Sequence, residues 1–79
     1  MAKIWKEVVV EYHQNFHWWQ VWGCLADGSR DHLASSQFKM EAIEEARLYA
    51  FDTSCGPTRA HSVKVLTKAG KLQKFIIEG

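Results

Sequence analysis

Four histidines and two cysteines are the residues of this 79-residue chain best suited by type to catalysis or metal binding. His13 and His17 are four residues apart around an expected turn, whereas His32 and His61 are distant in the sequence. A protein zinc site needs three or four converging ligands, and the sequence has neither a CxxC pair nor an HxxxH spacing on an expected helix. We therefore interpret the histidines as surface residues near turns, and we predict no metal and no cofactor.

The cysteines lack the surroundings of a nucleophile. A reactive cysteine needs a helix N-terminus or a cation that favours its thiolate. Cys24 lies within an expected strand with no basic residue beside it in the sequence, and Cys55 follows an expected helix, where the dipole disfavours a thiolate. Asp27 is explained by a turn, and no Gly-rich phosphate loop or G-x-S-x-G motif is found. We predict no enzymatic activity and no small-molecule substrate.

Composition and charge restrict the other classes of protein. The chain is 47% apolar and 24% charged, which is typical of a globular protein, and its length predicts one domain over residues 1–79. The net charge of +1 provides no overall field toward nucleic acid or anionic lipid. No stretch approaches the length of a membrane span. With no recognisable signal peptide and only two cysteines, we expect a cytoplasmic protein with reduced thiols.

Three strands are expected before the helix. Residues 3–13 are rich in β-branched side chains, and residues 17–26 follow a turn at Gln14-Asn15. Trp18 and Trp22 then fall on one face of the second strand and Trp19 on the other. In the first strand, alternation predicts one face bearing Val8, Val10 and Tyr12 and the other bearing Trp5 and Val9. Asp27-Gly28 predicts a two-residue hairpin turn into a third strand over residues 29–35.

A helix is expected over residues 36–52, with Ser35 or Ser36 as its cap. A stop at Cys55-Gly56-Pro57 is expected to end it. At 100° per residue one stripe forms the core face of this helix. The residues of that stripe are Phe38, Ala42, Ile43, Ala46, Tyr49 and Ala50.

Residues 61–68 and 71–78 are expected to form a final hairpin around Ala69-Gly70. A direct turn would place Val63 and Val65 beside Leu72 and Ile76, whereas a turn with a glycine bulge would place them beside Phe75 and Ile77. The two registers remain open from the sequence. The element order predicts an α+β fold, an antiparallel sheet of four to five strands with one helix packed on one face.

The residues from Trp18 onward resemble a family of small bacterial domains of unknown function with a strand–strand–helix–strand–strand plan. The resemblance rests on Trp19-Gln20-Val21, on the Ala-Ser-Ser before the helix, on the helix residues 41–47 and on Gly70-Lys71. The family commonly has a threonine cap where this chain has Phe38. A second resemblance, to the arm-type DNA-binding domain of tyrosine recombinases, rests on Trp19-Gln20-Val21-Trp22, residues 27–30, Phe38 and Glu41-Ala42. It implies a sheet that contacts DNA.

An excess of apolar side chains is the most informative feature for function. The first hairpin is apolar on both faces, although the face of a sheet away from its helix is normally polar. Exposed apolar patches typically mark contacts between proteins, unless the loops and the N-terminal strand fold over them. The predicted interface residues are Trp5, Trp18, Trp19 and Trp22 on the first hairpin and Met40, Leu48 and Phe51 on the back of the helix.

These features lead to two functional hypotheses. The first is a protein-interaction module, which forms a homodimer or acts as a small phage-type inhibitor of a larger protein complex. The second is a nucleic-acid-binding module in which exposed aromatics stack on bases. Its predicted contacts are the basic residues Arg30, Arg59, Lys64, Lys68, Lys71 and Lys74. The same lysines are also explained as charges that protect a sheet edge.

Overall fold

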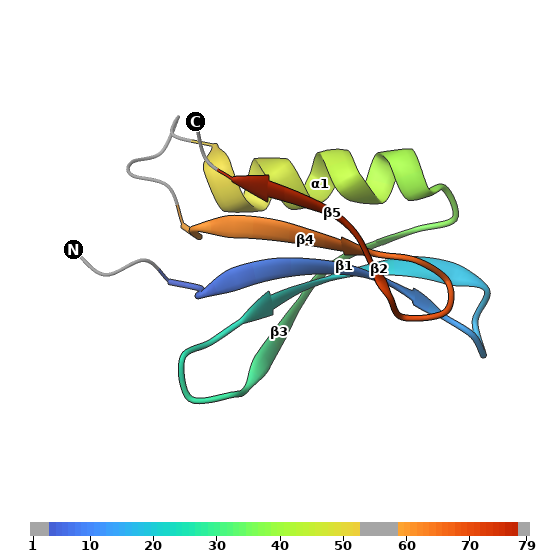
Figure 1. Cartoon of the computed structure of the whole chain (residues 1–79), viewed down its shortest axis with the longest axis horizontal. Helices are drawn as coiled ribbons and strands as arrows, with labels where there is room; N and C mark the ends of the chain where they lie inside the picture. The colour runs from blue at the N-terminus through green and yellow to red at the C-terminus, as the bar shows by residue number, and fades with distance from the viewer. Residues whose placement is uncertain (1–3, 53–58, 78–79) are drawn as a thin grey trace.

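The protein was analysed as a computed structural model that describes residues 4–52 and 59–77. The described chain forms five strands and one helix (Figure 1). In chain order these are β1 (Glu7–His13), β2 (Trp18–Cys24), β3 (Arg30–Ser36), α1 (Lys39–Phe51), β4 (Ser62–Leu66) and β5 (Leu72–Ile77). The predicted α+β class is therefore confirmed, and each predicted element is present with its ends shifted by a few residues.

The five strands form one sheet in the order β3-β2-β1-β4-β5, with β1 at its centre. β1 pairs with β2 in an antiparallel arrangement but with β4 in a parallel one. The prediction of a wholly antiparallel sheet was therefore wrong. The cause is the crossover through α1, which returns the chain to the sheet so that β4 runs in the same direction as β1.

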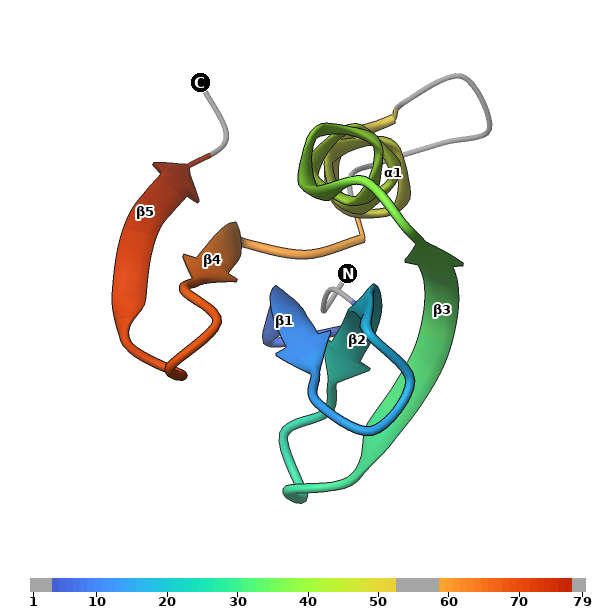
Figure 2. The ribbon, with the colours of Figure 1, turned by 90° about the vertical axis from the view of Figure 1, so that its right-hand side faces the viewer.

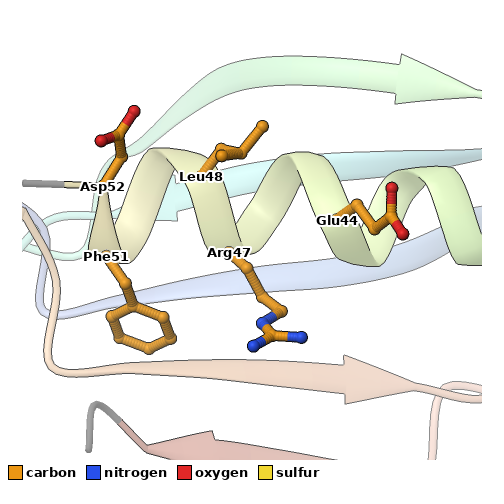
Figure 3. A pocket seen from close by; sticks show the side chains of 5 residues that line it. All are labelled: Glu44, Arg47, Leu48, Phe51 and Asp52. Carbon is orange, nitrogen blue, oxygen red and sulfur yellow. The ribbon is translucent and has the colours of Figure 1, made fainter. Parts of the chain in front are cut away.

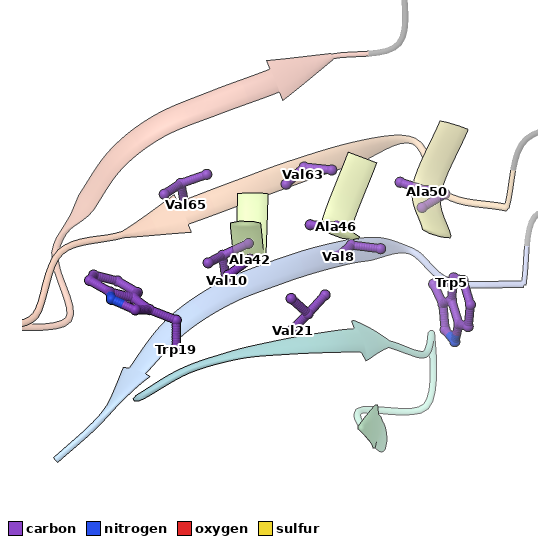
Figure 4. Close-up of a cluster of buried hydrophobic side chains, with 11 residues drawn as sticks. Trp5, Val8, Val10, Trp19, Val21, Ala42, Ala46, Ala50, Val63 and Val65 are labelled. Carbon is purple, nitrogen blue, oxygen red and sulfur yellow. The ribbon is translucent and has the colours of Figure 1, made fainter. Parts of the chain in front are cut away.

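The core lies between α1 and the concave face of the sheet, which curves around the helix (Figure 2). Ala42, Ala46 and Ala50 are fully buried, and their small side chains bring the helix close to the sheet. The strands contribute a layer of β-branched side chains (Figure 4). Its fully or almost fully buried members are Val8, Val10, Val21, Val63 and Val65.

The ends of α1 differ from the prediction. The helix begins at Lys39, and its N-cap is Phe38, which has extended backbone angles and no capping side chain. Phe38 is 63% exposed, so its placement in the core stripe was wrong. Ser36 does not cap the helix itself; its hydroxyl accepts the Phe38 N–H and donates to Glu41. The predicted stop at Cys55-Gly56-Pro57 lies outside the described residues.

Two of the hairpins end in three-residue loops closed by a glycine with positive φ. Gly28 has φ 92° and its N–H bonds to the Leu25 carbonyl, so the predicted two-residue turn at Asp27-Gly28 was wrong. The Ser29 hydroxyl and N–H both donate to Asp27 and hold the pKa of that carboxyl below its usual value. Gly70 has φ 84° and closes the last hairpin in the same way.

The last hairpin follows the direct register for Ile76 but not for Leu72, and the alternative that places the valines beside Phe75 and Ile77 was wrong. Val63 pairs with Ile76, as in the direct register. Leu66 pairs with Leu72 beyond an irregularity next to the turn, so Leu72 lies on the opposite face from Val65. Because of this shift, Leu72 lies on the same face of the sheet as Phe75 and Ile77, and only Ile76 among the apolar residues of β5 faces the helix side.

Trp5 lies in the core, not on the opposite face with Val9 as predicted. Its bridge to Ala60 precedes β1, and its side chain is only 7% exposed. The indole covers Gly23, where a Cβ atom would lie 2.5 Å from Trp5 Nε1. The indole N–H donates to Asp31 at 3.0 Å, and the ring meets Tyr49 edge-on at 6.4 Å. Trp5 therefore extends the core beyond the N-terminal end of β1.

Over residues 4–52 and 59–77, no helix combines the length and apolar character needed to cross a membrane.

Candidate functional site on the open sheet face

The sheet face away from α1 is not covered by any described element, and we refer to it as the open face (Figure 2). Strand alternation and the observed pairing place side chains from all five strands there, with aromatic groups mainly from β2 and β5 and polar or charged groups mainly from β1, β3 and β4. The open face carries Glu7, Val9, Glu11 and His13 from β1, Trp18, Gln20, Trp22 and Cys24 from β2, Arg30, His32 and Ser35 from β3, Ser62, Lys64 and Leu66 from β4, and Leu72, Phe75 and Ile77 from β5.

Trp22 lies on β2 and is enclosed by two side chains of β3. The Arg30 guanidinium carbon is 4.7 Å from the centre of its ring, and the His32 ring meets it at 5.0 Å and 66°. His32 is in turn bonded to the Ser35 hydroxyl at 2.9 Å. These contacts leave Trp22 half-buried and fix its ring on the open face.

The charges on the open face are paired across strands. Arg30 donates to Glu11 at 3.0 Å, which links β3 to β1. Lys64 lies 3.5 Å from Glu7, which links β4 to β1. Partly exposed pairs of this kind contribute only about 0–1 kcal/mol to stability. Their main effect is to leave the centre of the open face without net charge.

One end of the open face is aromatic. The Phe16 ring lies 4.5 Å from His13 and 5.3 Å from Trp18, and it is 59% exposed. His17 ends the β1–β2 loop with a positive φ of 56° and contacts the Tyr12 hydroxyl at 3.4 Å. This loop also meets the β4–β5 loop, because the Gln14 amide donates to the Lys68 carbonyl.

Polar atoms without partners are concentrated on this face. Within the described residues, four buried side-chain nitrogens and oxygens have no hydrogen-bond partner, and all four lie on the open face. They are His13 Nδ1, Trp18 Nε1, Gln20 Oε1 and Trp22 Nε1. A buried polar group without a partner costs about 1–3 kcal/mol. Among the described residues, the buried polar side-chain atoms of the open face therefore make fewer hydrogen bonds than those of the core beneath α1.

The structure separates the predicted tryptophans. Trp18 and Trp22 lie half-buried on the open face, as strand alternation predicted. Trp19 is 6% exposed and packs against Tyr12, with Lys39 Nζ 5.1 Å from its ring centre. Trp5 and Trp19 are thus core residues, and they do not belong to the candidate site.

The back of α1 carries the remaining predicted interface residues. Met40 is 70% exposed and Leu48 57% exposed, whereas Phe51 is half-buried and packs against the core. A shallow cavity of about 430 Å³ lies beside the C-terminal half of the helix (Figure 3). It is lined by Glu44, Arg47, Leu48, Phe51 and Asp52. In Figure 3, Phe51 and Arg47 point to one side of the helix and Leu48 and Asp52 to the other, so the apolar patch is divided.

The predicted nucleic-acid contacts are not on one surface. Arg30 and Lys64 lie on the open face in ion pairs, and Lys68 Nζ lies 4.9 Å from the centre of the Tyr12 ring. Lys71 is exposed beside the β4–β5 loop, and Lys74 is paired with Val65 on the helix side of β5. Arg59 precedes β4, where its backbone bonds to Trp5 and Ala50.

Cys24 has a basic neighbour that the sequence did not indicate. It pairs with Arg30 across β2 and β3. Burial raises the pKa of the Cys24 thiol, and this effect outweighs Arg30, which lowers the pKa. The thiol is therefore held in its protonated form, which is the less reactive one. Among the described residues, no three histidine, cysteine or acidic side chains are grouped so that they could hold a metal ion.

Sequence reasoning missed three apolar residues of this surface. Phe16 was given no place in an element or an interface, and Phe75 and Ile77, which are 48% and 68% exposed, were considered only for their register. The run Phe75-Ile76-Ile77 is apolar on both faces and was a usable signal, but the face of each residue depended on the register of the hairpin. Comparison of the chain with protein-family models, with curated proteins and with solved structures finds no match.

Proposed function

We propose that this protein is a non-enzymatic protein-interaction module that binds through the open face of its sheet. The observation that carries the proposal is the aromatic end of that face, where Phe16 is 59% exposed and packs beside the half-buried Trp18. A partner that covers this aromatic surface lowers the free energy, because apolar area is removed from water. A half-buried tryptophan beside an arginine is also the combination that dominates protein interfaces.

The electrostatics of the open face favour a protein partner over a polyanion. Its central charges are already paired, Arg30 with Glu11 and Lys64 with Glu7. A nucleic acid would have to compete with these carboxylates for both cations. A protein surface can accept such neutral pairs at the rim of an interface, where they contribute to specificity.

The first occupant to test is a second copy of the chain. Sedimentation velocity over a concentration series is expected to show a shift from monomer to dimer. The double substitution Phe16→Ser/Trp22→Ser is expected to raise the dissociation constant of the dimer by about tenfold or more. The reason is that loss of a hot-spot aromatic costs about 2 kcal/mol or more of binding free energy. Met40→Ser/Leu48→Ser, on the back of α1, is the matched control and leaves the shift unchanged.

A larger protein partner is tested with the same variants. The immobilised chain is expected to retain a defined partner that the Phe16→Ser/Trp22→Ser variant fails to retain and the helix variant still retains. A chain that stays monomeric at every concentration, and whose captured proteins do not depend on Phe16 and Trp22, would contradict the proposed function.

One observation favours a second candidate, the binding of single-stranded nucleic acid. Exposed Phe16 lies at the same end of the sheet as Lys68, because the β1–β2 and β4–β5 loops are in contact through Gln14 (Figure 1). An aromatic side chain beside a lysine can stack on a base and contact a phosphate. Tryptophan fluorescence titrated with oligonucleotides at low salt tests this candidate. Binding that is absent, or that does not weaken as salt is added, rejects it.

A further inference from the structure

β5 is an edge strand whose outer side is unpaired within the described residues. It pairs only with β4, and no described element lies beyond it (Figure 2). α1 contacts the other four strands but not β5. Five of the six residues of β5 are exposed. The outer edge of such a strand presents a row of backbone N–H and C=O groups able to pair with another strand.

The side chains beside this edge are largely apolar. Phe75 is 48% exposed and Ile77 68% exposed, and both lie on the open face opposite Lys64 and Ser62. Leu72 is 58% exposed next to the turn. A strand added to β5 would therefore place alternate side chains against apolar groups, which gives such an addition its specificity.

The edge is also the basic part of the molecule. Residues 59–77 contain five basic and no acidic residues, whereas residues 4–52 contain eight acidic and four basic residues. Lys64 is paired with Glu7 and Lys68 lies over Tyr12. Lys71 and Lys74 are exposed and meet no carboxylate within residues 4–52 and 59–77. These two lysines lie along the exposed edge.

We propose that β5 accepts an extended acidic segment of a partner protein as a sixth strand of the sheet. Alternate apolar side chains of that segment would pack beside Phe75 and Ile77, and its carboxylates would pair with Lys71 and Lys74. Main-chain hydrogen bonds to the edge supply affinity in this mode of recognition. Phe75 and Ile77 belong to the open face, but the backbone edge of β5 and the two lysines do not, so the proposal does not require binding at Trp22 and does not rest on the proposed function.

The charge of the hairpin disfavours a second copy of β5 as the occupant. Pairing of β5 with itself would bring together two hairpins that each carry four lysines and no acidic residue over residues 62–77. Lysine on an edge strand is a common protection against such self-pairing. An acidic segment converts the same repulsion into attraction.

The probe is a blocked peptide of alternating valine and glutamate, six residues long to match β5. Titration of the intact isotopically labelled chain, followed by amide chemical shifts and hydrogen exchange, is expected to protect and shift the β5 amides. Affinity is expected to fall as salt is added, because the charges are exposed. Two peptides serve as controls: one with lysine in place of glutamate, and one with a backbone methylated at alternate nitrogens, which cannot complete the ladder. Neither is expected to bind.

Variants of the chain locate the contacts. Lys71→Glu/Lys74→Glu is expected to weaken binding by about tenfold, the combined effect of two lost and reversed exposed ion pairs. Lys6→Glu, an exposed lysine outside the hairpin, is the control and has a much smaller effect. Trp22→Ser is expected to leave peptide binding unchanged, which separates this proposal from the proposed function.

Three results would overturn the proposal. The first is a folded chain whose β5 amides are unaffected by the peptide at the highest soluble concentration. The second is binding of the peptide around Trp22 on β2 and not along β5, shown by shifts that are lost in the Trp22→Ser variant. The third is protection of the β5 amides that grows with protein concentration in the absence of peptide, since this would assign the edge to a second copy.

Discussion

Gly23 illustrates how one residue can determine where an aromatic side chain lies. The position has no side chain of its own, and the Trp5 indole fills the space, with three ring atoms 2.5 to 2.7 Å from a Cβ placed there. Gly23→Ala is expected to displace the indole and lower the free energy of unfolding by about 1–3 kcal/mol, the usual cost of overpacking. Urea denaturation measures this change.

A double-mutant cycle shows whether the cost arises from the indole. In a Trp5→Leu background the ring is absent, so Gly23→Ala is expected to cost much less than in the natural chain. The same cost in both backgrounds would mean that Gly23 is required for its backbone and not for its contact with Trp5.

Cys24 gives a prediction about alkaline pH. Burial raises the pKa of its thiol in the folded chain, despite the nearby Arg30. Above the ordinary thiol pKa of about 8.5 the unfolded chain loses this proton before the folded chain does, so stability falls as pH rises through the folded pKa. Relative to a Cys24→Ala variant, the natural chain is expected to lose stability between about pH 8 and pH 10. A constant difference in the free energy of unfolding over that range would contradict the raised pKa.

At the scale of the element, the start of α1 is the weakest local feature. Its N-cap is exposed Phe38, which offers no side-chain oxygen to the first turn. Phe38→Thr creates a Thr-x-x-Glu capping box with Glu41 and is expected to raise the free energy of unfolding by about 1 kcal/mol. Phe38→Ala removes the same exposed ring without adding an oxygen and serves as the control. Equal stabilities of the two variants in thermal or urea denaturation would contradict this view of the cap.

Elements were predictable from sequence because their signals are local. Alternation placed Trp18 and Trp22 on one face of β2 and Trp19 on the other, and helical spacing identified Ala42 and Ala46 as core residues. The parallel pairing of Val8 with Val63 has no local signal, since it joins residues on either side of two hairpins and a helix. For the same reason Trp5 was assigned to the wrong face: its position depends on Ala60 and Gly23, which are remote in sequence.

The candidate site was predictable only in part. The sequence pattern identified an excess of apolar residues on the first hairpin, but it did not indicate which tryptophans are buried in the core. Trp19 is buried because its strand face meets α1, and Trp5 because it covers a glycine. The pairing of Arg30 with Glu11 and the exposure of Phe75 arise from cross-strand register, which β-bulges and turn irregularities determine.

At the scale of the whole molecule, the two charge-segregated parts of the chain are joined at the centre of the sheet. β1, from the acidic part, pairs with β4, from the basic part, and Glu7 meets Lys64 at this junction. Val63 and Val65 of β4 complete the core under α1 with essentially no exposure. β1 therefore has an edge that only the second part of the chain covers.

This arrangement predicts that the fold is cooperative across the junction. A fragment of residues 1–58 would lose both valines, worth about 1.5–3 kcal/mol each when buried, together with the β4 ladder along β1. Because small domains have only about 5–15 kcal/mol of net stability, the fragment is expected to show no cooperative urea transition by circular dichroism or tryptophan fluorescence. Addition of a peptide of residues 59–79 is expected to restore the transition. A fragment that unfolds cooperatively by itself would instead mean that β1, β2, β3 and α1 form a folding unit to which the basic hairpin is only appended.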